Sequence, residues 1–158
     1  MHPKLDVWLR KEFAVFSKSC QHAMRILLRL SQLAPGELTN AEEVARVADV
    51  PPAYASKLLS QLAASGLVHA RRGPRGGVML GRSPHRISLM DVLEAVGEAD
   101  AVEDCFLGFA ECNESMQCPM HAVWKGLRGT LAKALLHRTL ADFQPKDARA
   151  RPRVTSPA

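Results

Sequence analysis

The spacing of hydrophobic residues predicts three successive helices between residues 17 and 66. The first run, SKSCQHAMRILLRLSQLAPGE, has apolar residues at intervals of three and four and is stopped by Pro35 and Gly36. The second, LTNAEEVARVADV, carries Thr39 followed three residues later by Glu42, the signature of a capping box. The third, PPAYASKLLSQLAASG, begins with prolines suited to a helix start and ends at Gly66. Three helices, with a tight connection between the last two, predict a helix-turn-helix.

The hydrophobic period changes after Gly66. Residues 67–71, LVHAR, and 78–80, VML, are typical of two short strands around the turn GPRGG, which predicts a β-hairpin or wing. The stretch SLMDVLEAVGEAD then predicts a helix with Ser88 as its N-cap and Asp91 in the capping-box position. Residues 99–117 have no sustained periodicity and are expected to form a loop. The expected fold is therefore mainly α with a small β-hairpin, a winged helix-turn-helix.

Beyond Pro119 the apolar residues follow a heptad pattern, with spacings of four, three, four and three. This is the seam of a helix packed along another helix. A second copy of the chain or a helix of the same chain could fill the seam, and the absence of another long predicted helix favours a homodimer. The expected dimer interface consists of Met120, Trp124, Leu127, Leu131 and Ala134.

Four regions are expected along the 158 residues. Residues 1–15 form an N-terminal extension, and residues 16–86 form the winged helix-turn-helix. Residues 87–143 contain the loop and the long dimerisation helix, ending in the short turn TLADF. The last region, residues 144–158, is polar, basic and rich in proline, and is expected to be disordered.

The positive charge of the chain is concentrated in one segment. The net charge is +5, and residues 50–90 contain six Lys and Arg residues and no acid, whereas residues 91–118 contain eight acids and no Lys or Arg. The first segment suits a polyanion and the second would be repelled by one. No apolar run approaches a membrane span, so we expect a cytoplasmic protein that does not enter a membrane. No nucleophile with a base and no phosphate loop can be placed, which argues against an enzyme.

The basic segment contains the residues that we expect to bind double-stranded DNA. On the third helix, the side opposite Leu58 and Leu62 carries short or polar groups that permit close approach to base edges: Ala53, Ser56, Lys57 and Ser60. The hydroxyl of Tyr54 could reach a phosphate, or its ring could pack beneath the helix. Arg71, Arg72 and Arg75 lie in a glycine-rich turn and suit phosphate or a narrow groove. The alternative is a solvated hairpin with surface arginines.

Three of the four cysteines occur in CFLGFAECNESMQCPMH, residues 105–121. The intervals of six, five and two residues fit zinc poorly, since zinc ligands usually come in close pairs. Cys105, Cys112, Cys118 and His121 could hold an iron–sulfur cluster, with [2Fe-2S] favoured and [4Fe-4S] possible. A regulatory disulfide, loop thiols without a metal, and a structural zinc are the alternatives. Cys20 is expected to be a buried small hydrophobic residue.

Three stretches, FSKSCQHAMRILLRL, LVHARRGPRGGVML and CFLGFAECNESMQCPMHAVW followed by TLADF, resemble the IscR/NsrR-type family of bacterial winged-helix transcription regulators. The resemblance covers residues 16–143. It implies a homodimer built through the long helix, a palindromic operator, and an iron–sulfur cluster whose state tunes DNA affinity. By position, Cys105, Cys112 and Cys118 resemble the cluster cysteines, and His121 the histidine ligand of the IscR branch. Gln21 stands where the NsrR branch has an aspartate ligand, which favours His121 as the fourth ligand, with Cys20 as the alternative.

The expected function is a dimeric transcription regulator, for example a repressor, that senses redox state, nitric oxide or iron–sulfur status through its cluster. One alternative is a DNA-binding regulator whose cysteines sense thiol chemistry without a cluster. Another is a small iron–sulfur electron-transfer or carrier protein, which would need the cluster but not the basic wing.

Overall fold

The computed structural model describes residues 16–102, 104–105, 107 and 118–144. The expectations for the N-terminal extension, for Cys112 and for the C-terminal tail lie outside these residues. The helices are α2 (Lys18–Leu30), α3 (Ala41–Val47), α4 (Pro52–Ala64), α5 (Leu89–Ala95) and α6 (His121–His137), and the strands are β1 (Val68–Arg71) and β2 (Gly77–Leu80). Short 3-10 turns occur at η1 (Pro84–Arg86), η2 (Ala99–Val102) and η3 (Leu140–Phe143). The predicted fold class, mainly α with a β-hairpin, is confirmed.

Capping side chains define where the helices start. Ser17 accepts a hydrogen bond from the Cys20 N–H at the start of α2. At the start of α5, Ser88 and Asp91 form the predicted capping box. The prediction for α3 is wrong by one residue: the cap is Asn40, whose Oδ1 accepts from the Glu43 N–H at 2.6 Å. Thr39 instead pairs its backbone with Val78, which takes it out of the capping position.

The wing is an antiparallel hairpin in which Val68 lies opposite Leu80 and Arg71 opposite Gly77. The bridge between Thr39 and Val78 adds the segment before α3 to its edge, with the Val78 N–H donating to Thr39 O at 2.8 Å. A side chain at position 77 would place its Cβ 2.6 Å from Thr39 O, so this close approach requires glycine. The glycine-rich turn therefore also serves the packing of the wing against the helices.

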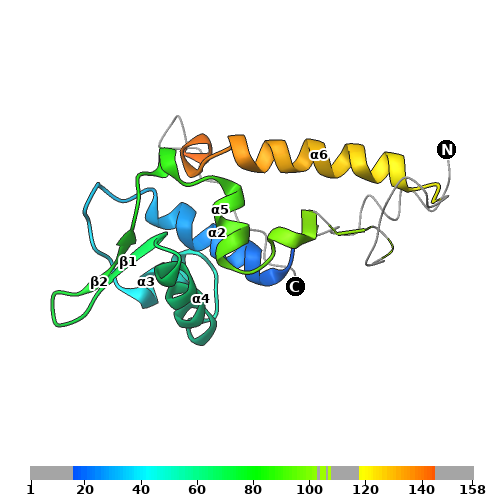
Figure 1. Cartoon of the computed structure of the whole chain (residues 1–158). Coiled ribbons are helices and arrows are strands. Elements are labelled where there is room, and N and C mark those ends of the chain that lie inside the picture. The colour runs from blue at the N-terminus through cyan, green and yellow to red at the C-terminus, as the bar shows by residue number, and fades with distance from the viewer. Residues whose placement is uncertain (1–15, 103, 106, 108–117, 145–158) are drawn as a thin grey trace, which may run out of the picture.

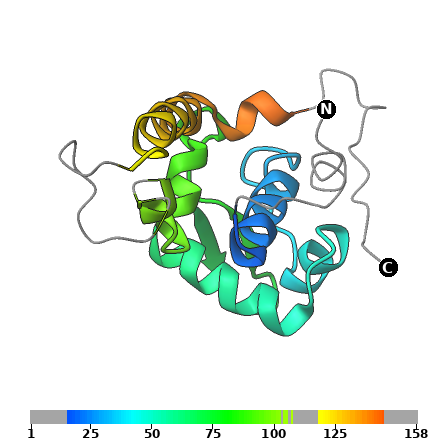
Figure 2. The same ribbon diagram turned by 90° about the vertical axis from the view of Figure 1, so that its right-hand side faces the viewer.

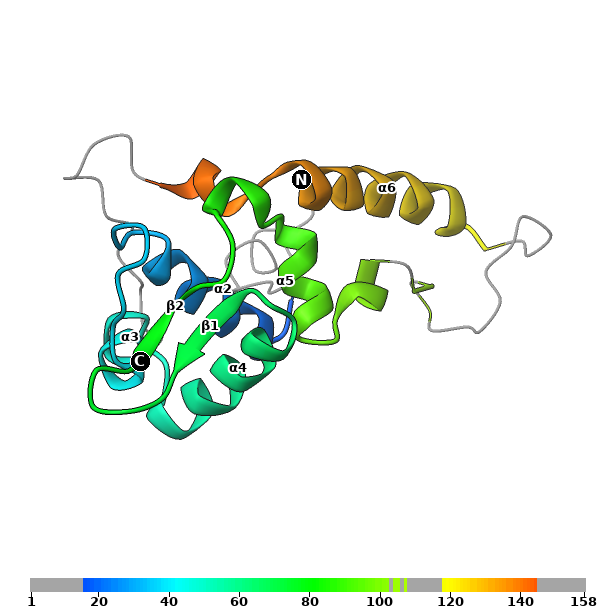
Figure 3. The same ribbon diagram turned by 60° about the vertical axis from the view of Figure 1, so that its left-hand side comes forward.

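Two groups of buried residues hold the chain together. The main core joins α2, α3, α4 and the hairpin, and it includes Leu58, Leu62 and Val92, which are fully buried. A smaller cluster contains Cys20, Met90, Leu93 and Leu135. Consecutive residues of α5, Val92 and Leu93, enter different clusters, so α5 connects the helix-turn-helix and the hairpin to α6. In all three ribbon views α6 lies on the opposite side of the molecule from α4 (Figures 1, 2 and 3).

One part of the predicted heptad seam of α6 packs against the chain's own residues, and another part is exposed to solvent. Leu131 of the seam packs against α5, as does Leu135 beside the seam, so part of the seam is filled within the chain. Leu127 is 57% exposed and Ala134 is also exposed, and Val123 beside them is 54% exposed. Met120 and Trp124 are half-buried. One face of the helix is thus packed and another is open. None of the helices in the described ranges is long and apolar enough to span a membrane.

Candidate nucleic-acid interface and metal centre

The exposed face of α4 consists of the residues that were predicted to read bases. Ala53, Ser56, Lys57 and Ser60 are exposed, while Leu58 and Leu62 on the other side are buried. The Ser56 hydroxyl donates to Pro52 O at 3.1 Å, and the Ser60 hydroxyl donates to Ser56 O at 3.0 Å. Because a serine oxygen carries two lone pairs, both can still accept hydrogen bonds from base edges. The face can therefore approach a groove closely and offers acceptors and one cation.

The side chain of Tyr54 holds α4 against α2. Its hydroxyl donates to Ser19 Oγ at 2.7 Å, and its ring meets His22 edge to face, with centroids 5.5 Å apart and an interplanar angle of 76°. Of the two roles that the sequence left open for Tyr54, the structure shows packing beneath the helix. The pKa of His22 is lowered by burial and by the nearby cations Arg25 and Lys18.

The turn between α3 and α4 contains a backbone feature that the hydrophobic pattern does not reveal. Asp49 has a φ of +54°, in the left-handed region. Arg25 of α2 donates to Asp49 O at 3.5 Å and lies 3.8 Å from Asp49 Oδ2. Aspartate tolerates this conformation better than most residues. The two prolines that follow Asp49 after Val50 are the signal that could have indicated a tight turn. These contacts hold the helix-turn-helix together from α2.

The wing arginines are exposed around the glycine-rich turn, and the turn lies on the side of the molecule away from α6, as α4 does (Figures 1 and 3). Arg71, Arg72 and Arg75 therefore lie on the same side of the molecule as α4, and the sequence has no acidic residue between positions 50 and 90. Exposed positive charge on this side of the molecule suits a nucleic-acid duplex, because guanidinium groups pair with phosphate oxygens.

The two ends of the cysteine segment lie at the start of α6. Cys118 is half-buried three residues before the first helical residue, His121, and its carbonyl accepts from the His121 N–H at 3.1 Å. At the other end, Cys105 is also half-buried. Trp124 Nε1 donates to Asp104 O at 2.7 Å, which ties the residue before Cys105 to the first turn of α6. The predicted ligand Cys112 lies outside the described residues.

The chemistry of these side chains fits an iron–sulfur cluster. Thiolate sulfur is the usual cluster ligand, and an imidazole can replace one cysteine. Within the ranges that the structure describes, no group of three metal-ligating side chains is assembled, so the structure does not bring Cys105, Cys118 and His121 together as one set of ligands. Cys20 does not belong to it: the thiol is 1% exposed, and burial, with Glu98 nearby, raises its pKa to about 11. It is therefore a protonated part of the smaller cluster, as expected.

A helical chain with a wing, a helix-turn-helix and an exposed basic surface defines a winged-helix DNA-binding protein. The model of the Rrf2 family, described as an iron-dependent transcriptional regulator, matches residues 16–146. The chain therefore belongs to the Rrf2 family. This is a family of transcriptional regulators rather than of enzymes, and DNA binding and transcription regulation follow from membership.

Individual relatives agree with this assignment. A protein of Aquifex aeolicus, named as an HTH-type transcriptional regulator, is 30% identical over 131 residues, which are 82% of this chain and 90% of that protein. IscR of Escherichia coli is 34% identical over 90 residues, 57% of this chain and 55% of that protein.

Solved structures show the same fold. The structure of CymR, the global cysteine regulator of B. subtilis, has a TM-score of 0.66 at 23% identity and covers 80% of this chain and 93% of that chain. IscR of T. potens has a TM-score of 0.63 at 20% identity and covers 80% of this chain and 83% of that chain.

Proposed function

We propose that this regulator binds a palindromic operator as a homodimer and that an iron–sulfur cluster, held by Cys105, Cys112, Cys118 and His121, controls its affinity. The main structural support is the hydrogen bond from Trp124 Nε1 to Asp104 O, which brings both ends of the cysteine segment to the start of α6. The description of the family as iron-dependent and the relationship to IscR agree with the proposal.

In this proposal, α4 enters the major groove and the wing lies beside it. Ala53, Ser56, Lys57 and Ser60 face base edges, and the arginines of the wing neutralise phosphates. Tyr54 acts indirectly, because its contacts with Ser19 and His22 hold the angle between α4 and α2. Operator affinity should fall steeply as salt rises, since several phosphates are neutralised in each subunit.

The open face of α6 supports a homodimer. Val123, Leu127 and Ala134 are exposed on a helix whose other side packs on α5, and an apolar face of this kind is stabilised by a partner. From the predicted seam, Leu127 and Ala134 are available to a second copy, whereas Leu131 is already packed within the chain. A two-fold dimer of this form would present two α4 helices to the two halves of a palindrome.

A matched pair of variants tests the dimer. Leu127→Asp places a charge on the open face and should convert the dimer to monomer at micromolar concentration, as measured by sedimentation. Ala122→Asp introduces the same charge at an exposed position of α6 away from that face, and it should leave the mass unchanged. A monomeric wild-type protein, or dimers of equal strength in both variants, would exclude this interface.

A structural change caused by metal ligation at the start of α6 can be transmitted to α4 through packed residues. Leu131 and Leu135 of α6 contact α5 in the smaller cluster, and α5 also enters the main core, which contains Leu58 of α4. When bound, the cluster supplies iron whose ligation depends on oxidation state, nitric oxide or iron supply. The thiolates of Cys105 and Cys118 would join the loop to α6, and DNA affinity changes only if this favours one arrangement of the two α4 helices.

Anaerobic purification tests the cluster directly. The wild-type protein should be coloured and contain iron and sulfide, Cys112→Ala should lose both, and Cys20→Ser should retain them because the Cys20 thiol is buried. Operator affinity is measured on the same samples with and without iron. A colourless, iron-free protein that binds its operator normally would refute the cluster proposal and leave the DNA-binding surface intact.

Thiol sensing without a metal is a second candidate. Two half-buried cysteines, Cys105 and Cys118, lie near one end of α6, and the fold is shared with CymR, whose Staphylococcus aureus form has also been solved oxidised. In this case an oxidant should change DNA affinity in iron-free protein. Alkylation should spare Cys20, because a pKa of about 11 in place of 9.0 leaves about a hundredfold less thiolate at pH 8.

A further inference from the structure

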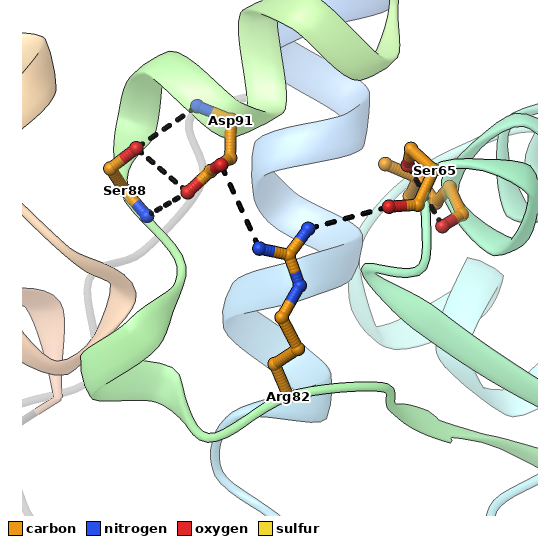
Figure 4. Close-up of polar contacts among 5 residues, drawn as sticks. Ser65, Arg82, Ser88 and Asp91 are labelled. Carbon is orange, nitrogen blue, oxygen red and sulfur yellow. Dashed lines mark hydrogen bonds and ion pairs between the residues drawn. The ribbon is translucent and has the colours of Figure 1, made fainter.

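Arg82 differs from the arginines of the wing in the direction of its side chain. Its guanidinium lies between two elements of the protein, as Figure 4 shows. Nη2 donates to Ser65 O at 3.3 Å, and Nη1 lies 3.8 Å from Asp91 Oδ1. The side chain is 39% exposed, so both contacts occur at the edge of the protein. By its charge alone, Arg82 would be grouped with the arginines of the wing that are proposed to bind DNA. Its contacts, however, are with Ser65 and Asp91 of the same chain.

The two partners of Arg82 belong to helices that are separate in sequence. Ser65 is the C-cap of α4, and its carbonyl lies at the negative end of that helix, where a cation is stabilising. Asp91 lies in the first turn of α5. Arg82 thus joins the end of the base-reading helix to the start of the helix that connects both buried clusters.

The carboxylate of Asp91 is held in one orientation. Its Oδ2 accepts from the Ser88 N–H at 2.7 Å and from the Ser88 hydroxyl at 2.8 Å, while the Asp91 N–H donates to Ser88 Oγ at 3.1 Å. Because Oδ2 is committed to the capping box, Oδ1 is the oxygen that faces Arg82 (Figure 4). The capping box therefore gives the guanidinium a fixed partner.

The start of α5 is in turn attached to the segment that follows α6. Ser88 and Thr139 form a backbone bridge, the Leu89 N–H donates to Arg138 O at 2.9 Å, and the Leu140 N–H donates to Ile87 O at 3.0 Å. A continuous series of contacts therefore runs from α4 through Arg82 to the end of α6.

We propose that Arg82 is a positioning residue for DNA binding, which holds the end of α4 against α5 and so orients the base-reading face without touching DNA. A guanidinium suits this role because its planar fork presents donors in two fixed directions. The proposal depends on DNA binding by the family and does not require the cluster.

Salt dependence distinguishes a positioning arginine from one that binds phosphate. The variant Arg82→Gln is compared with Arg75→Gln, which removes the same charge from the exposed wing. The probes are a duplex enriched from a random-sequence library by the wild-type protein and a scrambled duplex of the same length. Each is titrated at several salt concentrations, after melting curves have shown that every variant is folded.

Arg82→Gln should weaken binding of the enriched duplex about tenfold, the scale of one displaced base contact, with an unchanged salt slope. Its affinity for the scrambled duplex should stay at the wild-type value. Arg75→Gln should weaken both duplexes and reduce the magnitude of the salt slope by about one for each subunit.

Asp91→Asn provides a second, independent variant. An asparagine oxygen can still accept the Ser88 hydrogen bonds, but the ion pair with Arg82 is lost, so the same loss of specific affinity is expected. Because the two residues act as one unit, the double variant should be no worse than either single variant. Unchanged affinity in Arg82→Gln, a reduced salt slope, or additive losses would each overturn the proposal.

Discussion

Two parts of the molecule are stabilised in different ways: the DNA-binding unit, which consists of α2, α3, α4 and the hairpin, and the arm, which is α6. The DNA-binding unit has a core to which α2, α3, α4 and the hairpin all contribute, and several of its large side chains, among them Ile26, Leu58 and Leu62, are fully buried. The arm is attached by a small cluster in which Met90 is still 9% exposed, and it leaves Leu127 and Val123 open. A DNA-binding unit with a large core, joined to an arm that is packed by a smaller cluster, is an arrangement in which the arm can shift while the DNA-binding unit stays folded.

The largest effect is expected from a cavity in the main core. Leu58 is fully buried on the inner side of α4, so Leu58→Ala should lower the free energy of unfolding by about 3 kcal/mol. Denaturant titration measures this, and DNA binding should be lost together with the cooperative transition. A decrease in the free energy of unfolding below about 1 kcal/mol would mean that the main core does not stabilise the DNA-binding unit.

A cavity in the smaller cluster should have a more local effect. Leu135→Ala removes an α6 side chain that is 4% exposed, with an expected cost of about 2 kcal/mol, at the low end for buried leucines. Hydrogen exchange should accelerate in α6 before it does in α4, because the arm opens without the core. Equal acceleration in both helices would show that the two regions unfold as one unit.

The capping box of α5 tests the connection between the two regions. Ser88→Ala removes the acceptor for the Asp91 N–H and one donor to its carboxylate, and it should cost about 1 kcal/mol. The matched change Asn40→Ala removes the cap of α3, which lies within the DNA-binding unit. Only Ser88→Ala should also increase amide hydrogen exchange in residues 138–140, which pair with the start of α5. If both variants behave alike, α5 does not link the arm to the core.

The smallest effect concerns pH. The pKa of His22 is lowered in the folded protein, so the folded state binds fewer protons than the unfolded state below pH 6.5. Stability contributed by the neutral imidazole is therefore present above this pH and is lost as pH falls toward the folded-state pKa. His22→Phe, which keeps a ring against Tyr54, should flatten the decline in stability below about pH 6.5 in denaturant titrations. If the decline is unchanged in His22→Phe, titratable groups other than His22 cause it.

Local signals were enough to predict much of the fold. The helix-turn-helix, the hairpin around GPRGG and the capping box at Ser88 each depend on residues close in sequence, and all three are present. The cap of α3 was misplaced because Thr39 and Asn40 are both suitable caps, and only the distant strand residue Val78 selects between them. The same limit applies to Tyr54, whose packing depends on Ser19 and His22 of another helix.

The sequence by itself determined the class of fold, the concentration of positive charge and the set of possible metal ligands, because periodicity, charge and residue type are properties of the chain. Tertiary structure decided which members of these sets face the protein and which face outward. Arg82 has the same charge as Arg75 but lies between two helices, and Leu131 belongs to the same predicted seam as Leu127 but packs on α5. Such differences arise because burial and pairing depend on elements that meet only after folding.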